Sequence, residues 1–280
     1  MALSSSTYYT NSIVGQMMAG ADVNILVANS SPKYPVGQGL QRGDGNIYRY
    51  CHVGTATNAG TLVGPTTASG GATYGAAVVV APASAVTVPA EPHVTAGSVG
   101  SHYVEVTIAA IAANKYQGSY MIVTRGTGVG ETYRIVGNTA TNTPATGNLR
   151  IQLYEPIQVA FTAATSITIV GSPYTDCQAT QTTSAQATGV LMATTTSSLL
   201  WAWVCTHGYV GCTEDATIAP IAGNQIVASK NTAGAYMVLS NNGTTVASSS
   251  SYLPIIGYCV TPGGGTSGAT RQGAIYLQLE

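Results

Sequence analysis

Residues 120–136 read Tyr-Met-Ile-Val-Thr-Arg-Gly-Thr-Gly-Val-Gly-Glu-Thr-Tyr-Arg-Ile-Val. Two runs rich in β-branched and aromatic residues, 120–125 and 131–136, flank a glycine-rich segment, which is the pattern of a β-hairpin. The glycines at 126, 128 and 130 have G-x-G-x-G spacing, whereas a dinucleotide-binding loop has G-x-G-x-x-G and opens a helix. Because a strand-like run follows, we interpret this segment as a glycine turn and not as a phosphate site.

The same kind of signal recurs along the chain and predicts an all-β fold. Further strand-like runs cover residues 46–53, 148–154, 166–170, 189–194, 199–206, 225–229, 235–239, 254–260 and 274–279. Glycine or Asn-Gly separates most of them, and short strands spaced by turns indicate antiparallel β-sandwich or barrel modules. The one helical alternative is the Ala-rich stretch 104–114, whose opening Val-Glu-Val-Thr-Ile nevertheless alternates like a strand.

The distribution of these signals predicts three regions. Residues 1–45 contain Pro32, Pro35 and many glycines without sustained periodicity, so we expect an extended N-terminal arm with few contacts to its own domain. Residues 46–172 form one β-rich domain and residues 173–280 a second. Within the second, the threonine-rich stretch 174–187 is either a linker or a loose first strand.

The composition is unusually poor in charge. Only 7% of the 280 residues are charged, with 9 Lys+Arg against 10 Asp+Glu, whereas an ordinary soluble domain carries about 25%. The surface must therefore consist largely of Thr, Ser, Gly, Asn and Gln, which suits a protein packed against other proteins. A pI of about 6.4 argues against nucleic acid as a partner, because nucleic acid selects a basic surface.

Membrane insertion and secretion are not expected from the sequence. The most apolar run, residues 76–90, is interrupted by Pro82 and Pro89 and is too short to span a bilayer. The first residues have neither a basic region nor an apolar core like that of a signal peptide. The five cysteines are an odd number with no dense framework, so we expect free thiols made in a reducing compartment.

Residues that could carry chemistry are few. Cys205, His207 and Cys212 are the one Cys/His cluster, but their spacing lacks the tight pair and fourth ligand of a structural zinc site, so we expect no metal. Glu214 and Asp215 are the one neighbouring pair of carboxylates, and adjacent residues in a strand would point to opposite faces. No spacing suggests a catalytic triad, and we expect neither catalytic residues nor a cofactor, and hence no enzyme.

Several stretches together resemble structural proteins of tailed bacteriophages. In those proteins a glycine turn leads into an aromatic strand and then into an A-x-x-A-G turn. The stretches that are similar to their modules are residues 37–56, 58–63, 124–136, 153–167, 200–208, 222–229 and 255–259. The resemblance covers most of residues 37–280 and rests on patterns of glycine, aromatic and β-branched residues.

The resemblance implies a virion structural protein, and specifically a capsid decoration (cement) protein that binds the outside of a phage head and stabilises contacts between shell subunits. Its expected partners are the major capsid protein and copies of itself, as a homo-oligomer on the particle, with no nucleic acid and no membrane. It would be assembled in the host cytoplasm and located on the capsid surface. Two alternatives remain open, a phage tail or fibre protein that contacts a host receptor and a secreted carbohydrate-binding β-protein.

Five aromatic residues are candidates for the partner interface: Tyr34, Tyr48, Tyr50, Trp201 and Trp203. Trp201 and Trp203 are two positions apart on one predicted strand and should share a face, with Ala202 and Val204 on the other. Two neighbouring tryptophans are too apolar to stay in water, so we expect chain or partner to cover their face. An ordinary domain core and a subunit interface both satisfy that expectation.

Overall fold

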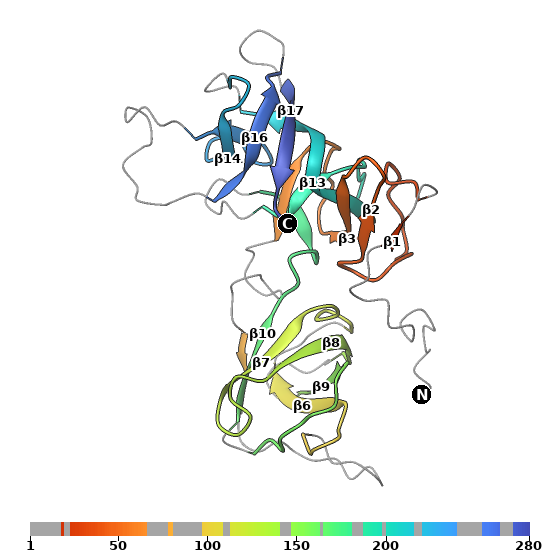
Figure 1. Ribbon diagram of the computed structural model, residues 1–280. Coiled ribbons are helices and arrows are strands. Elements are labelled where there is room, and N and C mark those ends of the chain that lie inside the picture. The colour runs from red at the N-terminus through yellow and green to blue at the C-terminus, as the bar shows by residue number, and fades with distance from the viewer. Residues whose placement is uncertain are drawn as a thin grey trace. The chain divides into compact units, whose positions relative to one another are not determined.

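In the computed structural model every regular element of the described residues is a β-strand, which confirms the predicted all-β class (Figure 1). The structure describes residues 18–19, 23–65, 78–80, 97–108, 113–140, 147–162, 165–180, 187–197, 200–215, 220–239, 254–263 and 271–280. Within these ranges no helix is long and apolar enough to cross a membrane.

The chain divides into two compact units, and their boundaries differ from those expected. Unit 1 combines residues 1–66 with 173–280, and unit 2 comprises residues 67–172. The predicted boundary after residue 172 coincides with one junction, but residues 46–65 belong with the C-terminal part of the chain. The reason is strand pairing between distant segments, because residues 47–53 and 62–65 pair with strands that lie beyond residue 176. Unit 2 is therefore inserted into the sequence of unit 1.

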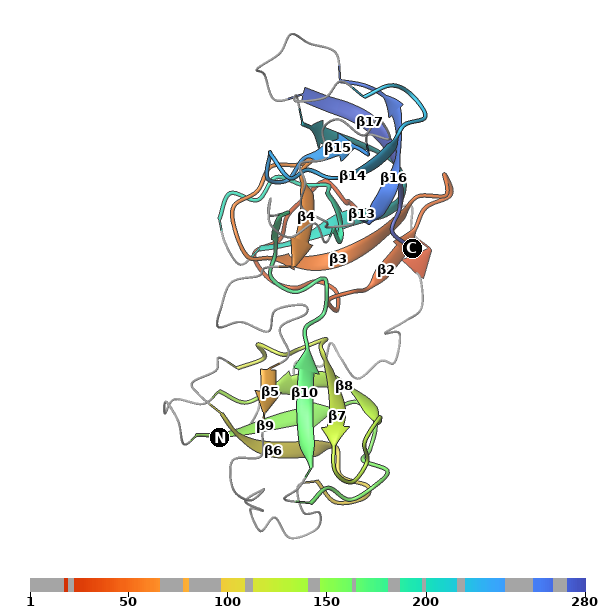
Figure 2. The ribbon, with the colours of Figure 1, turned by 90° about the vertical axis from the view of Figure 1, so that its left-hand side faces the viewer.

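Unit 1 is built on an 11-stranded sheet. Its strands are β1 (Met18–Ala19), β2 (Gly39–Gln41), β3 (Ile47–Val53), β4 (Leu62–Pro65), β11 (Cys177–Ala179), β12 (Gly189–Leu191), β13 (Leu200–Glu214), β14 (Gln225–Ala228), β15 (Tyr236–Val238), β16 (Ile255–Thr261) and β17 (Arg271–Gln278). The long strand β13 pairs antiparallel with β3 over its first half and with β17 over its second half. It also pairs with β12 and β15, so the sheet folds back on itself in a barrel-like arrangement (Figure 2).

A bulge in β13 marks the change of partner from β3 to β17. The register with β3 shifts between Cys205 and His207, and Gly208 follows with a φ of 102°. A Cβ at Gly208 would lie 1.9 Å from Oδ1 of Asn46, so glycine is required there by both conformation and space. The same Asn46 Oδ1 accepts a 3.0 Å hydrogen bond from the backbone N–H of Tyr209, which fixes the bend.

The two faces of β13 contribute to two separate hydrophobic clusters of unit 1. Trp203 and Cys205 lie in the larger cluster, against which Trp201 is partly buried. Ala202 and Val204 lie in the smaller cluster, together with Cys51, Val53, Val63, Cys177, Leu191 and Ala193. The prediction that the two tryptophans share one face, opposite Ala202 and Val204, is therefore confirmed.

The expected N-terminal arm is wrong for the part that the structure describes. Ile25 and Leu40 are buried in the larger cluster of unit 1, and Tyr34 packs against it. In addition, β2 pairs with β3, and Met18 pairs with Leu40. Apolar side chains before and after the prolines anchor this segment to its own unit, because their burial outweighs the irregular backbone. Residues 1–17 and 20–22 lie outside the described residues.

Unit 2 contains a six-stranded sheet in the order β5-β10-β7-β8-β9-β6 (Figure 2). Its strands are β5 (Val78–Val80), β6 (Tyr103–Ile108), β7 (Tyr120–Arg125), β8 (Thr132–Asn138), β9 (Gly147–Leu153) and β10 (Ser166–Val170). The predicted hairpin is confirmed, because β7 and β8 pair antiparallel across glycines with φ between 81° and 92°. The first part of the possible helix 104–114 is strand β6 instead, and residues 109–112 lie outside the described residues.

Unit 2 has a hydrophobic core of its own. It is formed by Val104, Tyr116, Met121, Val123, Tyr133, Ile135, Leu149, Ile151, Leu153, Ile157, Ile167 and Ile169. These residues come from β6, β7, β8, β9 and β10 and from the loops beside them. Each unit thus buries the apolar surface that a compact domain needs.

Candidate functional site

A row of tyrosines crosses three neighbouring strands of unit 1. Tyr209 of β13 is directly opposite Tyr276 of β17, and Tyr276 is directly opposite Tyr258 of β16. The neighbours of Tyr209 and Tyr276 along their strands, such as Val210 and Ile275, are buried in the larger cluster. Because side chains alternate along a strand, the three tyrosines point to the other, solvent-facing side of the sheet.

The rings contact one another across the strands. The centroids of Tyr258 and Tyr276 are 5.0 Å apart with nearly parallel planes, and the ring of Tyr209 meets that of Tyr276 edge-on at 4.9 Å. Such cross-strand aromatic pairs stabilise a sheet and hold the rings in place. Tyr209 is nevertheless 59% exposed. We call Tyr209, Tyr258 and Tyr276 the tyrosine row.

The outward strand positions around the tyrosine row carry no Asp, Glu, Lys or Arg. On β13 the outward positions are His207, Tyr209, Gly211 and Thr213, and on β17 they are Gln272, Ala274, Tyr276 and Gln278. Tyr258 on β16 and Gln225 on β14 extend this face. Gln225 continues the row, because it is the register partner of Tyr258. The face thus combines exposed aromatic surface with amide and hydroxyl groups, which can donate and accept hydrogen bonds without the desolvation cost of a buried charge.

His207 connects the tyrosine row to a polar network at one end of the sheet. Its Nε2 lies 3.0 Å from the hydroxyl of Tyr276, and its Nδ1 lies 3.2 Å from the backbone oxygen of Glu280. A carbonyl oxygen can only accept, so Nδ1 carries the proton and, in the neutral ring, Nε2 accepts from Tyr276. The histidine therefore fixes the orientation of Tyr276 from the side.

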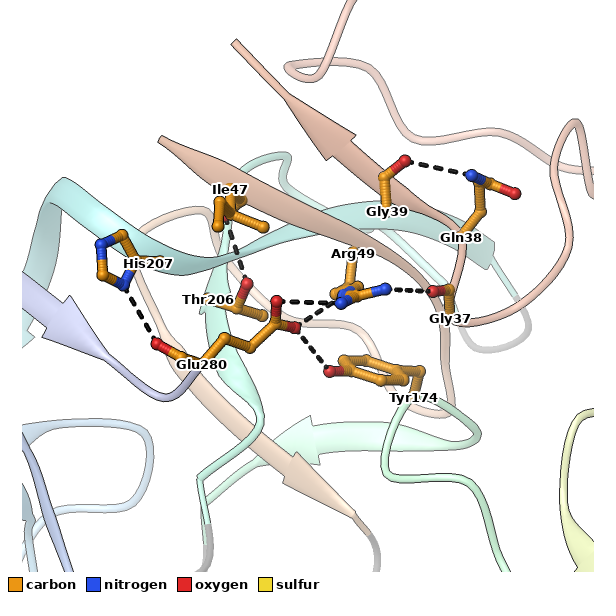
Figure 3. A network of polar contacts seen from close by, with 9 residues as sticks. All are labelled: Gly37, Gln38, Gly39, Ile47, Arg49, Tyr174, Thr206, His207 and Glu280. Atoms are coloured by element: carbon orange, nitrogen blue, oxygen red, sulfur yellow. Dashed lines mark hydrogen bonds and ion pairs between the residues drawn. The ribbon is translucent and has the colours of Figure 1, made fainter. Parts of the chain in front are cut away.

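The network itself is centred on the side chain of Glu280 (Figure 3). The guanidinium of Arg49 donates from Nε to Oε1 at 2.6 Å and from Nη2 to Oε2 at 2.9 Å, and the hydroxyl of Tyr174 donates to Oε1 at 3.2 Å. Arg49 also donates to the carbonyl of Gly37 at 3.2 Å. The hydrogen bond to Glu280 raises the pKa of Arg49, and burial followed by the charge of Glu280 raises the pKa of Tyr174. These contacts clamp the chain after β17 onto β3 and beside β13.

Three of the five predicted interface residues are not accessible in the structure. Tyr50 is fully buried, Trp203 is 1% exposed and Tyr48 is 3% exposed. Tyr50 and Trp203 pack on Tyr34 and on each other, with ring centroids 5.1 to 5.3 Å apart. These aromatic residues form the core of unit 1 rather than an interface, because β3 and β13 pair side by side and bring their rings together.

The other two predicted interface residues are partly buried. Tyr34 packs against the larger cluster, and Trp201 packs both on that cluster and on the ring of His52, whose centroid is 4.9 Å away. The prediction that the chain or a partner covers the tryptophans is thus confirmed for Trp203, which its own unit buries. The more exposed aromatic surface of unit 1 lies elsewhere, in the tyrosine row.

The Cys205/His207/Cys212 cluster does not converge on one point. The thiol of Cys205 donates to the backbone oxygen of His207, the thiol of Cys212 donates to that of Thr213, and the ring of His207 faces Tyr276. Among the described residues no group of three His, Cys, Asp or Glu side chains could hold a metal ion. All five cysteines are buried free thiols, as expected.

Comparison with known proteins gives no relative, because no family model, no curated protein and no solved structure matches the chain.

Proposed function

We propose that the chain is a capsid decoration protein, a non-enzymatic virion component that binds the outside of a phage head and clamps neighbouring shell subunits. Its partners would be the major capsid protein and further copies of itself. The observation that carries the proposal is the tyrosine row on the solvent-facing side of β13, β16 and β17, where the neighbouring outward positions of β13 and β17 hold no Asp, Glu, Lys or Arg. The resemblance of the sequence to phage structural proteins supplies the identity of the partner.

The tyrosine row has the properties of a protein-binding surface. Tyrosine is enriched at interfaces because it offers a large apolar ring and a hydroxyl that can still be satisfied. The cross-strand ring contacts and the hydrogen bond from Tyr276 to His207 hold the side chains before binding. A preordered surface loses less side-chain entropy on association. Because its outward strand positions carry no Asp, Glu, Lys or Arg, binding through this face buries few unpaired charges.

The presence of two units in one chain supports a clamping role. Each unit has its own hydrophobic core, and each can offer contacts to a shell. When one unit is bound, the second binds from a high effective concentration, so several weak contacts give firm retention. Cementing of this kind requires many modest contacts rather than one strong site.

The proposal predicts how the chain leaves the particle. Purified particles should retain it in about 1 M NaCl, because few charges are available to be screened, and release it in urea. The amount of chain released into each solution measures this effect.

Tyr209→Glu would place a negative charge in the tyrosine row and should lower affinity for the particle by about tenfold or more, which corresponds to at least about 1.4 kcal/mol. Binding of the purified wild type and variant to particles stripped of the chain measures this loss of affinity.

Tyr154→Glu is the matched control, because Tyr154 is 45% exposed and lies in unit 2. It should weaken binding clearly less than Tyr209→Glu, because it leaves the tyrosine row unchanged. Release of the wild-type chain by salt alone, or equal loss of binding in both variants, would contradict a role of the tyrosine row in particle binding.

A carbohydrate-binding protein is the second candidate, and the exposed ring of Tyr209 beside glutamine amides favours it. Aromatic faces can pack on the C–H faces of neutral sugars while amides bind their hydroxyls. Retention of the wild-type chain, but not of Tyr209→Ala, on an immobilised neutral polysaccharide would favour this function over the decoration role.

A further inference from the structure

Two cysteines of unit 1 lie together in the smaller hydrophobic cluster. Cys51 is in β3, Cys177 begins β11, and both have no exposed surface. Cys177 is the parallel register partner of Val53, and Cys51 shares the face of Val53 because it is two residues earlier on the same strand. Sequence spacing gave no sign of this pairing, since 126 positions separate the two residues.

The two thiols are hydrogen-bonded to each other. The thiol of Cys177 also lies 3.3 Å from the backbone oxygen of Pro173, which can only accept. Cys177 therefore donates to Pro173. The hydrogen bond with Cys51, followed by burial, raises the pKa of the Cys177 thiol, which keeps this thiol protonated and slow to react in the closed structure.

The other three cysteines have oxygen partners instead. Cys205 and Cys212 donate to backbone oxygens, and Cys259 is hydrogen-bonded to the side chain of Tyr236. The sulfur–sulfur contact thus distinguishes the pair Cys51 and Cys177 from the rest.

We propose that Cys51 and Cys177 are a latent disulfide, which forms when the chain meets a disulfide oxidant such as oxidised glutathione. One thiolate attacks a glutathione sulfur and releases one reduced glutathione. The second thiolate then attacks the mixed disulfide, so that the Cys51–Cys177 bond forms and a second reduced glutathione leaves. Two protein thiols are oxidised and one glutathione disulfide is reduced to two thiols.

The bond would fasten the chain at the point where it returns from unit 2. Cys177 follows the junction at residue 173, and β11 holds that return segment against β3 and β4. A cross-link from residue 51 to residue 177 encloses the whole of unit 2 and restricts the unfolded chain. The oxidised protein should therefore melt at a higher temperature than the reduced one. This inference is independent of the decoration role.

The test uses the full-length reduced protein with oxidised glutathione. The urea concentration is set at the lowest value at which iodoacetamide labels both Cys51 and Cys177, so that access is assured. After removal of urea, peptide mapping without reduction should show a Cys51–Cys177 disulfide, with the melting temperature raised until a reductant is added. Cys259→Ser should give the same disulfide, whereas Cys51→Ser should leave Cys177 as a mixed disulfide with glutathione.

The wild-type peptide map decides the question even if Cys51→Ser fails to fold. Mixed disulfides at both sites without closure, or a bond that links other cysteines, would overturn the proposal. Persistence of both thiols under these conditions would overturn it as well.

Discussion

Replacing Trp203 with alanine should lower the free energy of unfolding of unit 1 by about 3–5 kcal/mol, the usual cost of deleting a buried tryptophan. The side chain is 1% exposed and lies between Tyr34 and Tyr50, with ring centroids 5.3 and 5.1 Å away. These neighbours are held by β3 and the preceding segment and cannot close the cavity. Urea unfolding followed by circular dichroism measures the loss.

Trp201→Ala is the control for this experiment. Trp201 lies on the same face of β13 but is only partly buried, so its removal should cost clearly less. Unit 2 should retain its own stability in both variants, because its core is formed by other residues. Equal effects of the two substitutions would contradict the assignment of Trp203 to the core.

Alkaline pH should destabilise the protein strongly. Burial raises the pKa of the Cys205 thiol from 9.0 to about 12 and raises the pKa values of the Tyr48, Tyr50 and Tyr116 phenols above 10.0. The folded state therefore keeps these groups neutral at a pH where the unfolded chain ionises. Below the pKa that each group has in the unfolded chain, its contribution to stability is fully present. The contribution is lost as the pH rises from that unfolded pKa to the raised pKa of the folded state.

Each such group costs up to about 1.4 kcal/mol for every pH unit above its ordinary pKa. Urea unfolding between about pH 8 and about pH 11 should show a falling free energy that steepens above the phenol pKa. Cys205→Ala should remove one contribution, so the fall should be shallower than in the wild type. A free energy that stays level or rises over this range would contradict the burial of these groups.

The strands could be predicted because their signals are local. Residues 120–125 and 131–136 are joined by a short glycine turn, so the hairpin β7–β8 needs no distant partner. Alternation also placed Trp201 and Trp203 on one face of β13 and Ala202 and Val204 on the other. Such patterns depend on period and turn chemistry, both of which are visible in the residues themselves.

The division into units could not be predicted, because it depends on pairing between distant strands. The stretch 62–65 carries no strong strand signal of its own, yet β4 pairs with β11 and β12 across the whole of unit 2. Similarly, residues 23–45 looked like an arm because Pro and Gly interrupt them. Their few apolar residues, such as Ile25 and Leu40, are buried by strands that come much later in the chain.

The candidate site was missed for the same reason. Tyr209, Tyr258 and Tyr276 stand far apart in sequence, and only the registers of β13, β17 and β16 place them in one row. The sequence instead indicated an interface at aromatic residues within strongly alternating runs, namely Tyr48, Tyr50 and Trp203. That alternation is a sign of burial on one side, so it marks core at least as often as interface.

The decoration role is tested most directly by the number of copies of this chain on an intact particle. Virus particles are purified from a culture in which this chain is produced from its native genome, and the ratio of this chain to the major capsid protein is measured by quantitative mass spectrometry. The proposal predicts hundreds of copies, in fixed ratio to the shell subunit. A handful of copies would indicate a tail protein, and complete absence from the particle would contradict a structural role in the virion.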